Sequence, residues 1–342
     1  MARIGRGGER EEPRNGDVNP DGDRLANKVT DSNVSGNLVQ AHSIGELNIH
    51  GSRIVVAAQD DAPAVGWRGR AELRVGGERL LLHDPVTESL SGDGAVRRHQ
   101  ALAQRLSSPH GYVWLRHDAV LRPTVGETPG ARALDREAAL LDRLGRRTEL
   151  PRIVVHRADT TGSVLALHWP ERTDGGPCDT LARLLERAAG PLAIWPAQRL
   201  LTALAELAGT LARLHAHGLS HRLLEPTGII AASGGRLLPR DLGAAAQPPA
   251  AGEGPGDHQA PEQSHRGYGV PGPATDAYRL AAIAYHLVMG VPPHPRHPLP
   301  VPTDRLPSEA GRALADALAA EPGNRPDLSE LGRRLLTAYG RY

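Results

Sequence analysis

The stretch that decides the fold is residues 214–230, which read LHAHGLSHRLLEPTGII. It starts where a predicted helix ends, and Pro196 fits the first turn of that helix. Five leucines spaced by four and three share one face of the helix: Leu200, Leu204, Leu207, Leu211 and Leu214. Such spacing is typical of a helix that faces a core. The stretch therefore predicts a long buried helix that runs into a polar loop.

Short motifs follow this stretch in a fixed order. Asp241-Leu242-Gly243 comes first, Ala260-Pro261-Glu262 second, and Arg325-Pro326 last. Between the second and the third, the nearly all-apolar segment 280–288 predicts a buried helix, with Asp276 as its cap and Gly290 at its end. Two more helices are predicted over 309–320 and 328–338.

Together these residues resemble the catalytic core of bacterial serine/threonine protein kinases. Residues 221–228 resemble the catalytic loop H-R-D-L-K-P-x-N, and the next two motifs resemble D-F-G and A-P-E. The resemblance implies a bilobal α+β fold with a small β-rich N-lobe and a helical C-lobe. It also implies a structural role for six residues, with Glu262 and Arg325 as an ion pair: His221, Arg222, Gly243, Glu262, Asp276 and Arg325.

Several parts of a kinase's phosphotransfer machinery are missing from the matching positions. Leu223 stands where the family has the aspartate that accepts the substrate proton, and Glu225 stands where it has the catalytic-loop lysine. Gly228 replaces the asparagine that holds a second magnesium ion. Lys28 is the only lysine, so no lysine of the third strand can grip the phosphates. No G-x-G-x-x-G is present either. The catalytic residues are therefore not intact.

Three positions keep some link to a cofactor. Asp241 matches the magnesium ligand of D-F-G, and Glu137 matches the glutamate of the N-lobe helix. Either Arg116 or Arg122 would replace the third-strand lysine and pair with Glu137. The resemblance thus leaves ATP and magnesium as the only cofactors to consider, without requiring them. A histidine group at 215, 217 and 221 follows the family's own pattern, so we do not expect a metal there.

The first half of the chain predicts strands with one helix. Residues 69–83 read as a hairpin turned by Gly76-Gly77, and a short helix is predicted over 96–106. Further strands are predicted over 112–121, 152–156 and 163–167, and a helix over 132–144. We therefore expect five parts: a disordered tail (1–27), a β-prone segment (28–56), a linker (57–66), an N-lobe (67–170) and a C-lobe (171–342).

Composition excludes several classes of function. The formal net charge is +1, which argues against a dedicated nucleic-acid binder. The single cysteine, Cys178, allows no internal disulfide and is expected to be inert. No signal peptide or stretch of roughly 20 apolar residues is present, so a cytoplasmic protein without a membrane segment is expected.

Residues 30–51 have the composition of a cross-β segment, with amides and small residues alternating with branched apolar ones and no proline. Asn33–Ala41 and Ile44-Gly45 loosely resemble the short amyloid-forming signalling motifs of bacterial immune and cell-death adaptors. That resemblance implies homotypic assembly through residues 28–56. A disordered tail or an edge strand explains the same residues equally well.

The sequence as a whole predicts a pseudokinase that binds partner proteins as a signalling scaffold or regulator. A first alternative is a divergent serine/threonine kinase that transfers the γ-phosphate of ATP to protein hydroxyls with Asp241 and another base. A second alternative is an adaptor driven by templated assembly of residues 28–56.

Overall fold

The computed structural model describes residues 47–49, 52–54, 67–91, 94–121, 132–250, 252–254, 256–264, 269–294 and 304–339. By its contacts the chain divides into two units, residues 1–57 and 58–342. In the first unit, β1 (Leu47–Ile49) pairs antiparallel with β2 (Ser52–Ile54). The rest of the predicted 28–56 segment, the 1–27 tail and the 57–66 linker lie outside the described residues.

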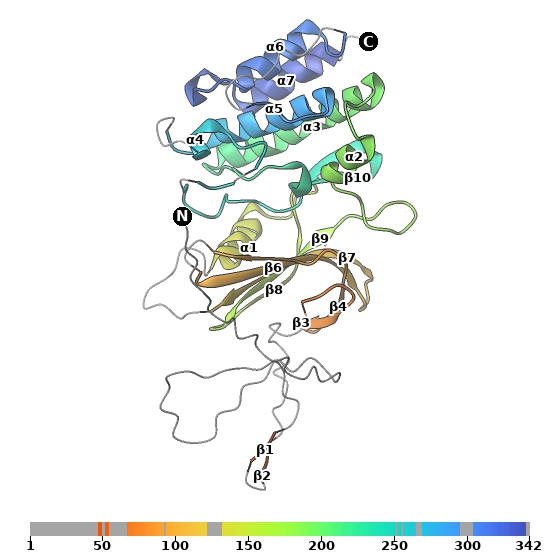
Figure 1. Cartoon of the computed structure of the whole chain (residues 1–342), viewed down its shortest axis with the longest axis vertical. Helices are drawn as coiled ribbons and strands as arrows, with labels where there is room; N and C mark the ends of the chain where they lie inside the picture. Colours follow the sequence, from red (N-terminus) through yellow and green to blue (C-terminus); the bar gives the residue numbers. More distant parts are fainter. Residues whose placement is uncertain are drawn as a thin grey trace, which may run out of the picture. The chain divides into compact units, whose positions relative to one another are not determined.

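The second unit contains an antiparallel sheet in its first half (Figure 1). Its strands run in the order β3-β4-β6-β7-β9-β8, and β5 pairs with β6. Their bounds are β3 (Glu72–Val75), β4 (Glu78–Leu82), β5 (Thr87–Leu90), β6 (Val96–Arg105), β7 (Gly111–Val120), β8 (Ile153–Ala158) and β9 (Gly162–Trp169). The predicted hairpin is confirmed, since β3 and β4 pair across Gly76 and Gly77, which have φ of 56° and 83°.

The sheet is curled. Leu73 and Val75 of β3 pack in one cluster with Val155 of β8, although these two strands lie at opposite ends of the strand order. A side chain at Gly76 would meet Val155 and Arg157, which explains the glycine at this close approach. The curl gives the first half a core of its own, separate from the core of the helices.

The predicted helix over 96–106 is wrong, because these residues form β6. Its side chains alternate between two environments: Ala101 and Ala103 are fully buried, and Gln100 and Leu102 are half-buried. This is the period of two that a strand requires. Pairing along nearly all of β7 and with β5 stabilises the strand, so tertiary contacts override the helix propensity of the alanines.

Helices make up the second half, where α3, α5, α6 and α7 stack together (Figure 1). One helix, α1 (Ala133–Leu144), belongs to the first half and packs on β8 and β9 of the sheet. The helices of the second half are α2 (Leu181–Ala188), α3 (Ile194–Ala216), α4 (Pro261–Ser264), α5 (Pro273–Met289), α6 (Ser308–Ala317) and α7 (Leu328–Tyr339). A small sheet pairs β10 (Ile229–Ala232) with β11 (Arg236–Pro239), and short 3₁₀ turns lie at 226–228, 233–235 and 322–324. The predicted mixed α+β class is confirmed.

The core of this half forms around α3 and α5. Leu201, Leu204, Leu207 and Leu211 of α3 are almost completely buried, as is the apolar run of α5. The α5 helix begins at Pro273 after Gly272, so Asp276 lies inside the first turn and is not the cap. The apolar run starts at Leu280, about two turns after the helix begins, so a cap inferred from that run falls too late in the chain. Gly290 ends the helix in a left-handed conformation with φ of 74°, as predicted.

Candidate functional site

A small polar cavity of about 270 Å³ lies where the sheet meets the loops of the helical half. Its walls come from β6, β7, α1, the loop that contains Leu223 and Glu225, and the segment around Asp241. Ligand pockets usually measure about 300–1,000 Å³, so this cavity is at the lower limit. It brings together Arg116, Glu137, Leu223, Glu225, Asp241 and Gly243 of the residues that the resemblance selected.

Arg116 on β7 and Glu137 on α1 form a buried ion pair, with Arg116 Nη2 2.6 Å from Glu137 Oε2. The backbone N–H of Leu242 also donates to Glu137 Oε1 at 3.0 Å. This contact links α1 to the segment that carries Asp241. Between the two arginines that the sequence left open, Arg116 contacts Glu137. Arg122 lies outside the described residues.

The loop at residues 221–223 is fixed by Asp276, whose carboxylate is fully buried. The backbone N–H groups of His221 and Arg222 donate to it at 2.8 and 2.6 Å, and His215 Nε2 lies 2.9 Å away. The sequence predicted that Asp276 caps its own helix. In the structure its carboxylate instead accepts hydrogen bonds from two backbone N–H groups of this loop. Arg222 has a φ of 59°, a left-handed backbone conformation that residues other than glycine rarely adopt. The short N–H donations to Asp276 hold the backbone in that conformation.

The side chain of Arg222 is buried and spans towards the segment after Asp241. Its guanidinium donates to the carbonyl oxygens of Ala244 and Gln247 and lies 3.6 Å from Glu253 Oε2. The carbonyl of Arg222 in turn accepts from Gln263 Nε2 at 2.8 Å. Arg222 thus fastens the residues between Ala244 and Gln263 to the loop, which is a structural role.

Leu223 and Glu225 line the cavity at the two positions where the charge pattern departs from the kinases. Leu223 offers no group that could accept a proton. Glu225 lies 3.5 Å from Arg279, a guanidinium that is completely buried in α5. Arg279 also donates to Gln263 Oε1 at 2.7 Å and to the carbonyls of Leu224 and Gly254. Glu225 therefore balances a buried charge.

Asp241 is already neutralised by the protein itself. Arg240 Nε lies 3.0 Å from its Oδ2, and the Gly243 N–H donates to its Oδ1 at 3.0 Å. Burial disfavours the charged form, but the positive charges of Arg240 and Arg116 outweigh it and hold the pKa of Asp241 well below its usual range. Both carboxylate oxygens thus have partners within the chain.

Arg240 also closes the neighbouring space. Its guanidinium carbon lies 4.3 Å from the ring centroid of Trp114, a cation–π contact, and its Nη1 donates to the Thr227 carbonyl at 3.2 Å. The Trp114 ring packs 6.1 Å from that of Trp169. These two rings form a cluster with four further residues: Leu102, Tyr112, Cys178 and Ile230. Arg240 therefore joins the Trp114 cluster to the segment that carries Asp241.

The arrangement does not fit a magnesium–nucleotide complex. Asp241 has both carboxylate oxygens engaged within the chain, and Gly228 offers no side-chain oxygen, so the side chains that would hold magnesium in a kinase are occupied or replaced. Among the described residues, no group of three or more histidine, cysteine, aspartate or glutamate side chains is placed to hold a metal ion. Cys178 is buried and free.

Glu262 and Arg325 are not among the residues that line the cavity. Glu262 and Arg325 form a fully buried bidentate ion pair with both distances at 2.8 Å, and Thr275 Oγ1 donates to Glu262 Oε1. Gly243 has a φ of 56° and lies against His221, so a side chain there would clash with the His221 ring and carbonyl.

Sequence reasoning missed three features of this site. The kinase resemblance points only to positions where a kinase has a functional residue. Trp114, Arg240 and Arg279 are not at such positions, so the sequence did not single them out. A signal existed for two of them: Trp114 lies two residues before Arg116, and Arg240 directly precedes Asp241.

Comparison with known proteins supports a kinase-like domain. No family model matches the chain. Over 177 residues, it is 33% identical to a protein of Deinococcus radiodurans described as the DNA damage-responsive serine/threonine-protein kinase RqkA. The match covers 44% of this chain and 25% of that protein, so the chain spans about a quarter of the length of the relative it matches. Within the described residues, no helix is both long and apolar enough to cross a membrane.

Proposed function

We propose that this chain is a kinase-like protein that does not transfer phosphate and instead works by binding partner proteins. The observation that carries the proposal is the position of Arg240. It lines the cavity, stacks on Trp114 and pairs with Asp241, so this one side chain neutralises the remaining metal ligand.

Two further contacts support the proposal. Leu223 has no proton-accepting group, and loss of a catalytic base alone typically lowers a rate by about 10²–10⁴. Glu225 is committed to the buried Arg279 and would repel a phosphate. Phosphoryl transfer depends on positioning and charge neutralisation, so an acid at this position opposes it.

The test is thermal melting of the full chain with ATP, with and without magnesium. A ligand at about 100 times its Kd adds roughly 2.7 kcal/mol to the free energy of unfolding. We expect no shift of the wild-type melting temperature at about 5 mM ATP, which is about five times the upper end of the usual KM range, about 1 mM. A magnesium-dependent shift of several degrees in the wild type would show that the site binds a metal–nucleotide complex, and phosphate transfer would then be tested next.

Arg240→Ala is the matched variant for this test. It removes both the cation on Trp114 and the partner of Asp241 and leaves Leu223 unchanged. Recovery of a magnesium-dependent shift in this variant alone would assign the exclusion of nucleotide to Arg240. A variant that also shows no shift would attribute the exclusion to Trp114 and its cluster, which Trp114→Ala then tests.

A divergent serine/threonine kinase is the second candidate, favoured by the similarity to a protein described as such a kinase. It would use Asp241 for the metal and a base other than Leu223. Transfer of labelled phosphate from ATP to the chain itself or to a generic protein substrate, abolished by Asp241→Ala, would establish it. The same absence of transfer in both forms would reject it.

Templated assembly through residues 28–56 stays a prediction of the sequence. A peptide of these residues that forms dye-binding fibres would support it, and a monomeric, dye-negative peptide would remove it.

A further inference from the structure

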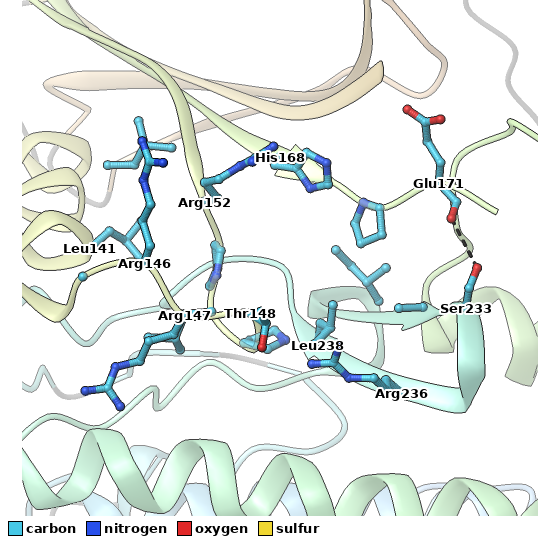
Figure 2. A pocket seen from close by; sticks show the side chains of 18 of the residues that line it. Leu141, Arg146, Arg147, Thr148, Arg152, His168, Glu171, Ser233, Arg236 and Leu238 are labelled. Carbon is cyan, nitrogen blue, oxygen red and sulfur yellow. Dashed lines mark hydrogen bonds between the residues drawn. The ribbon is translucent and has the colours of Figure 1, made fainter. Parts of the chain in front are cut away.

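The largest of the described pockets lies away from the polar cavity and has a volume of about 770 Å³ (Figure 2). Its walls come from the segment after α1, the start of β8, the end of β9 and the β10–β11 hairpin. An occupant would therefore contact both halves of the second unit. The volume lies in the range of established ligand sites, about 300–1,000 Å³.

The inside of this pocket is apolar. Leu141 and Ile230 are buried, Leu150 and Ile153 are half-buried, and Leu238 projects from β11. Prolines from three different segments complete the surface: Pro151, Pro170 and Pro239. An apolar surface of this kind binds branched aliphatic side chains by excluding water.

The rim of the pocket is positively charged. Arg146, Arg152 and Arg236 are exposed and form no ion pair with any described residue, while Arg147 donates its Nε–H to the Leu144 carbonyl. Figure 2 shows Arg146, Arg152 and Arg236 on different sides of the pocket. The two acids of the lining, Asp142 and Glu171, do not balance the four arginines. Unpaired guanidiniums are ready to bind carboxylates bidentately.

His168 adds no further charge. Burial, with the positive charge of Arg152 beside it, lowers the pKa of His168, so its ring is neutral at pH 7. Figure 2 shows Arg152 extending alongside this ring. The carboxylate of Glu171 stands at the opposite end of the pocket from Arg146, so it leaves the arginine rim open to an anion.

We infer that this pocket binds an acidic segment of a partner protein, in which aspartates or glutamates are interleaved with leucine, isoleucine or valine. This inference rests on the proposed function as a protein-binding scaffold and names the chemistry of the partner. A nucleic-acid backbone would satisfy the arginines and leave the apolar surface exposed to water. A fatty acid would cover the apolar surface and satisfy one arginine. The interleaved segment matches both.

The experiment is a selection from a displayed library of random 12-residue peptides against the full wild-type chain, with counter-selection on Arg152→Glu/Arg236→Glu. Enriched peptides are synthesised with a fluorophore and titrated by anisotropy. The control variant is Arg183→Glu/Arg333→Glu, which changes the charge equally at exposed arginines outside the pocket. Melting temperatures show that each variant is folded.

We expect enriched sequences to carry interleaved acids and branched apolar residues. Their affinity should fall by at least about tenfold on the pocket variant, remain within about twofold on the control, and weaken with salt. Basic or uncharged consensus sequences, no enrichment, or equal binding to both variants would overturn the inference. So would stronger binding of a random single-stranded oligonucleotide that competes with the peptides. The ATP melting test does not involve this pocket, so failure of either proposal is recognised separately.

Discussion

The contacts of Glu225 give this residue a structural role that its position in the sequence does not reveal. In the sequence it is a reversal of charge at a catalytic position, and in the structure it lies 3.5 Å from the buried guanidinium of Arg279. Burial raises the pKa of Glu225, while Arg279 opposes that rise and favours the charged form. The acid at this position is therefore part of the interior of the helical half as well as a barrier to phosphate.

A substitution at Glu225 tests this structural role. Glu225→Lys would remove the carboxylate that lies 3.5 Å from Arg279 and add a second positive charge beside it. Removing one partner of a buried pair costs about 3–5 kcal/mol, and the partial exposure of Glu225 reduces this, so we expect the free energy of unfolding to fall by about 1–3 kcal/mol. Urea unfolding measures it. Glu330→Lys, at an exposed helix position, is the control, and a loss at Glu225 no larger than at Glu330 would contradict the structural role.

For single residues, the sequence alone shows which residue types are absent from a position. It does not show which side chains contact each other across the fold. The absence of lysine after Lys28 and the identity of Leu223 are read directly from the chain. The contact of Arg240 with Trp114 joins β7 to the segment after β11, and no local pattern predicts it.

At the scale of elements, α7 packs very closely on α3. An ideal Cβ at Gly332 of α7 would lie 2.9 Å from the Ala205 carbonyl and 3.3 Å from the Ala208 Cβ of α3. Gly311 of α6 has nothing within 4 Å of the same position. Both glycines lie inside helices, where alanine is favoured intrinsically by about 1 kcal/mol. A comparison of alanine substitutions at these two positions therefore distinguishes the effect of helix propensity from the effect of packing.

Alanine substitution of these two glycines should have opposite effects. Gly311→Ala should raise the free energy of unfolding by about 0.4–1 kcal/mol, because it restricts the unfolded chain at an unobstructed site. Gly332→Ala should lower it by about 1–3 kcal/mol, because the methyl group would push two packed helices apart. Urea unfolding of both variants decides. Stabilisation by Gly332→Ala would show that the α3–α7 contact is looser than described.

Elements with a clear local pattern were predicted well. The Gly76-Gly77 hairpin, α1 and the apolar helices follow from turn residues and from the spacing of leucines. The strand β6 was mistaken for a helix, since alanines and arginines favour helices and only its partners β4, β5 and β7 select the strand. Its correct assignment needs the neighbours, which lie elsewhere in the chain.

For the whole molecule, buried histidines set the response to acid. His117 stacks with Trp67 and His99 in the curled sheet, and burial lowers its pKa to about 4. His258 contacts His286, with Nε2 and Nδ1 3.0 Å apart, and burial lowers its pKa to about 3. An unfolded histidine has a pKa near 6.5. The unfolded chain therefore binds more protons than the folded one below that value.

Stability should fall as the pH decreases from about 6.5 towards 4. Above pH 6.5 the His117 ring is neutral in both the folded and the unfolded state, and its contribution to stability is fully present. This contribution is lost as the pH falls from about 6.5 to about 4, and the total loss below the folded pKa is about 3 kcal/mol. Urea unfolding at pH 7 and pH 4.5 measures the loss. His117→Gln should show a smaller difference between the two pH values, and His110→Gln, at an exposed position, should keep the wild-type difference. An unchanged difference in His117→Gln would show that other groups carry the dependence.

Arg240 also has a mechanical consequence. Its guanidinium is held by the ring of Trp114 in the sheet half, and by Asp241 and the Thr227 carbonyl in the helical half. A swing of one half away from the other would have to pull this cation off the ring or off its oxygens. The side chain therefore links the two halves, and separating them would break a cation–π contact that contributes about 0.5–2 kcal/mol.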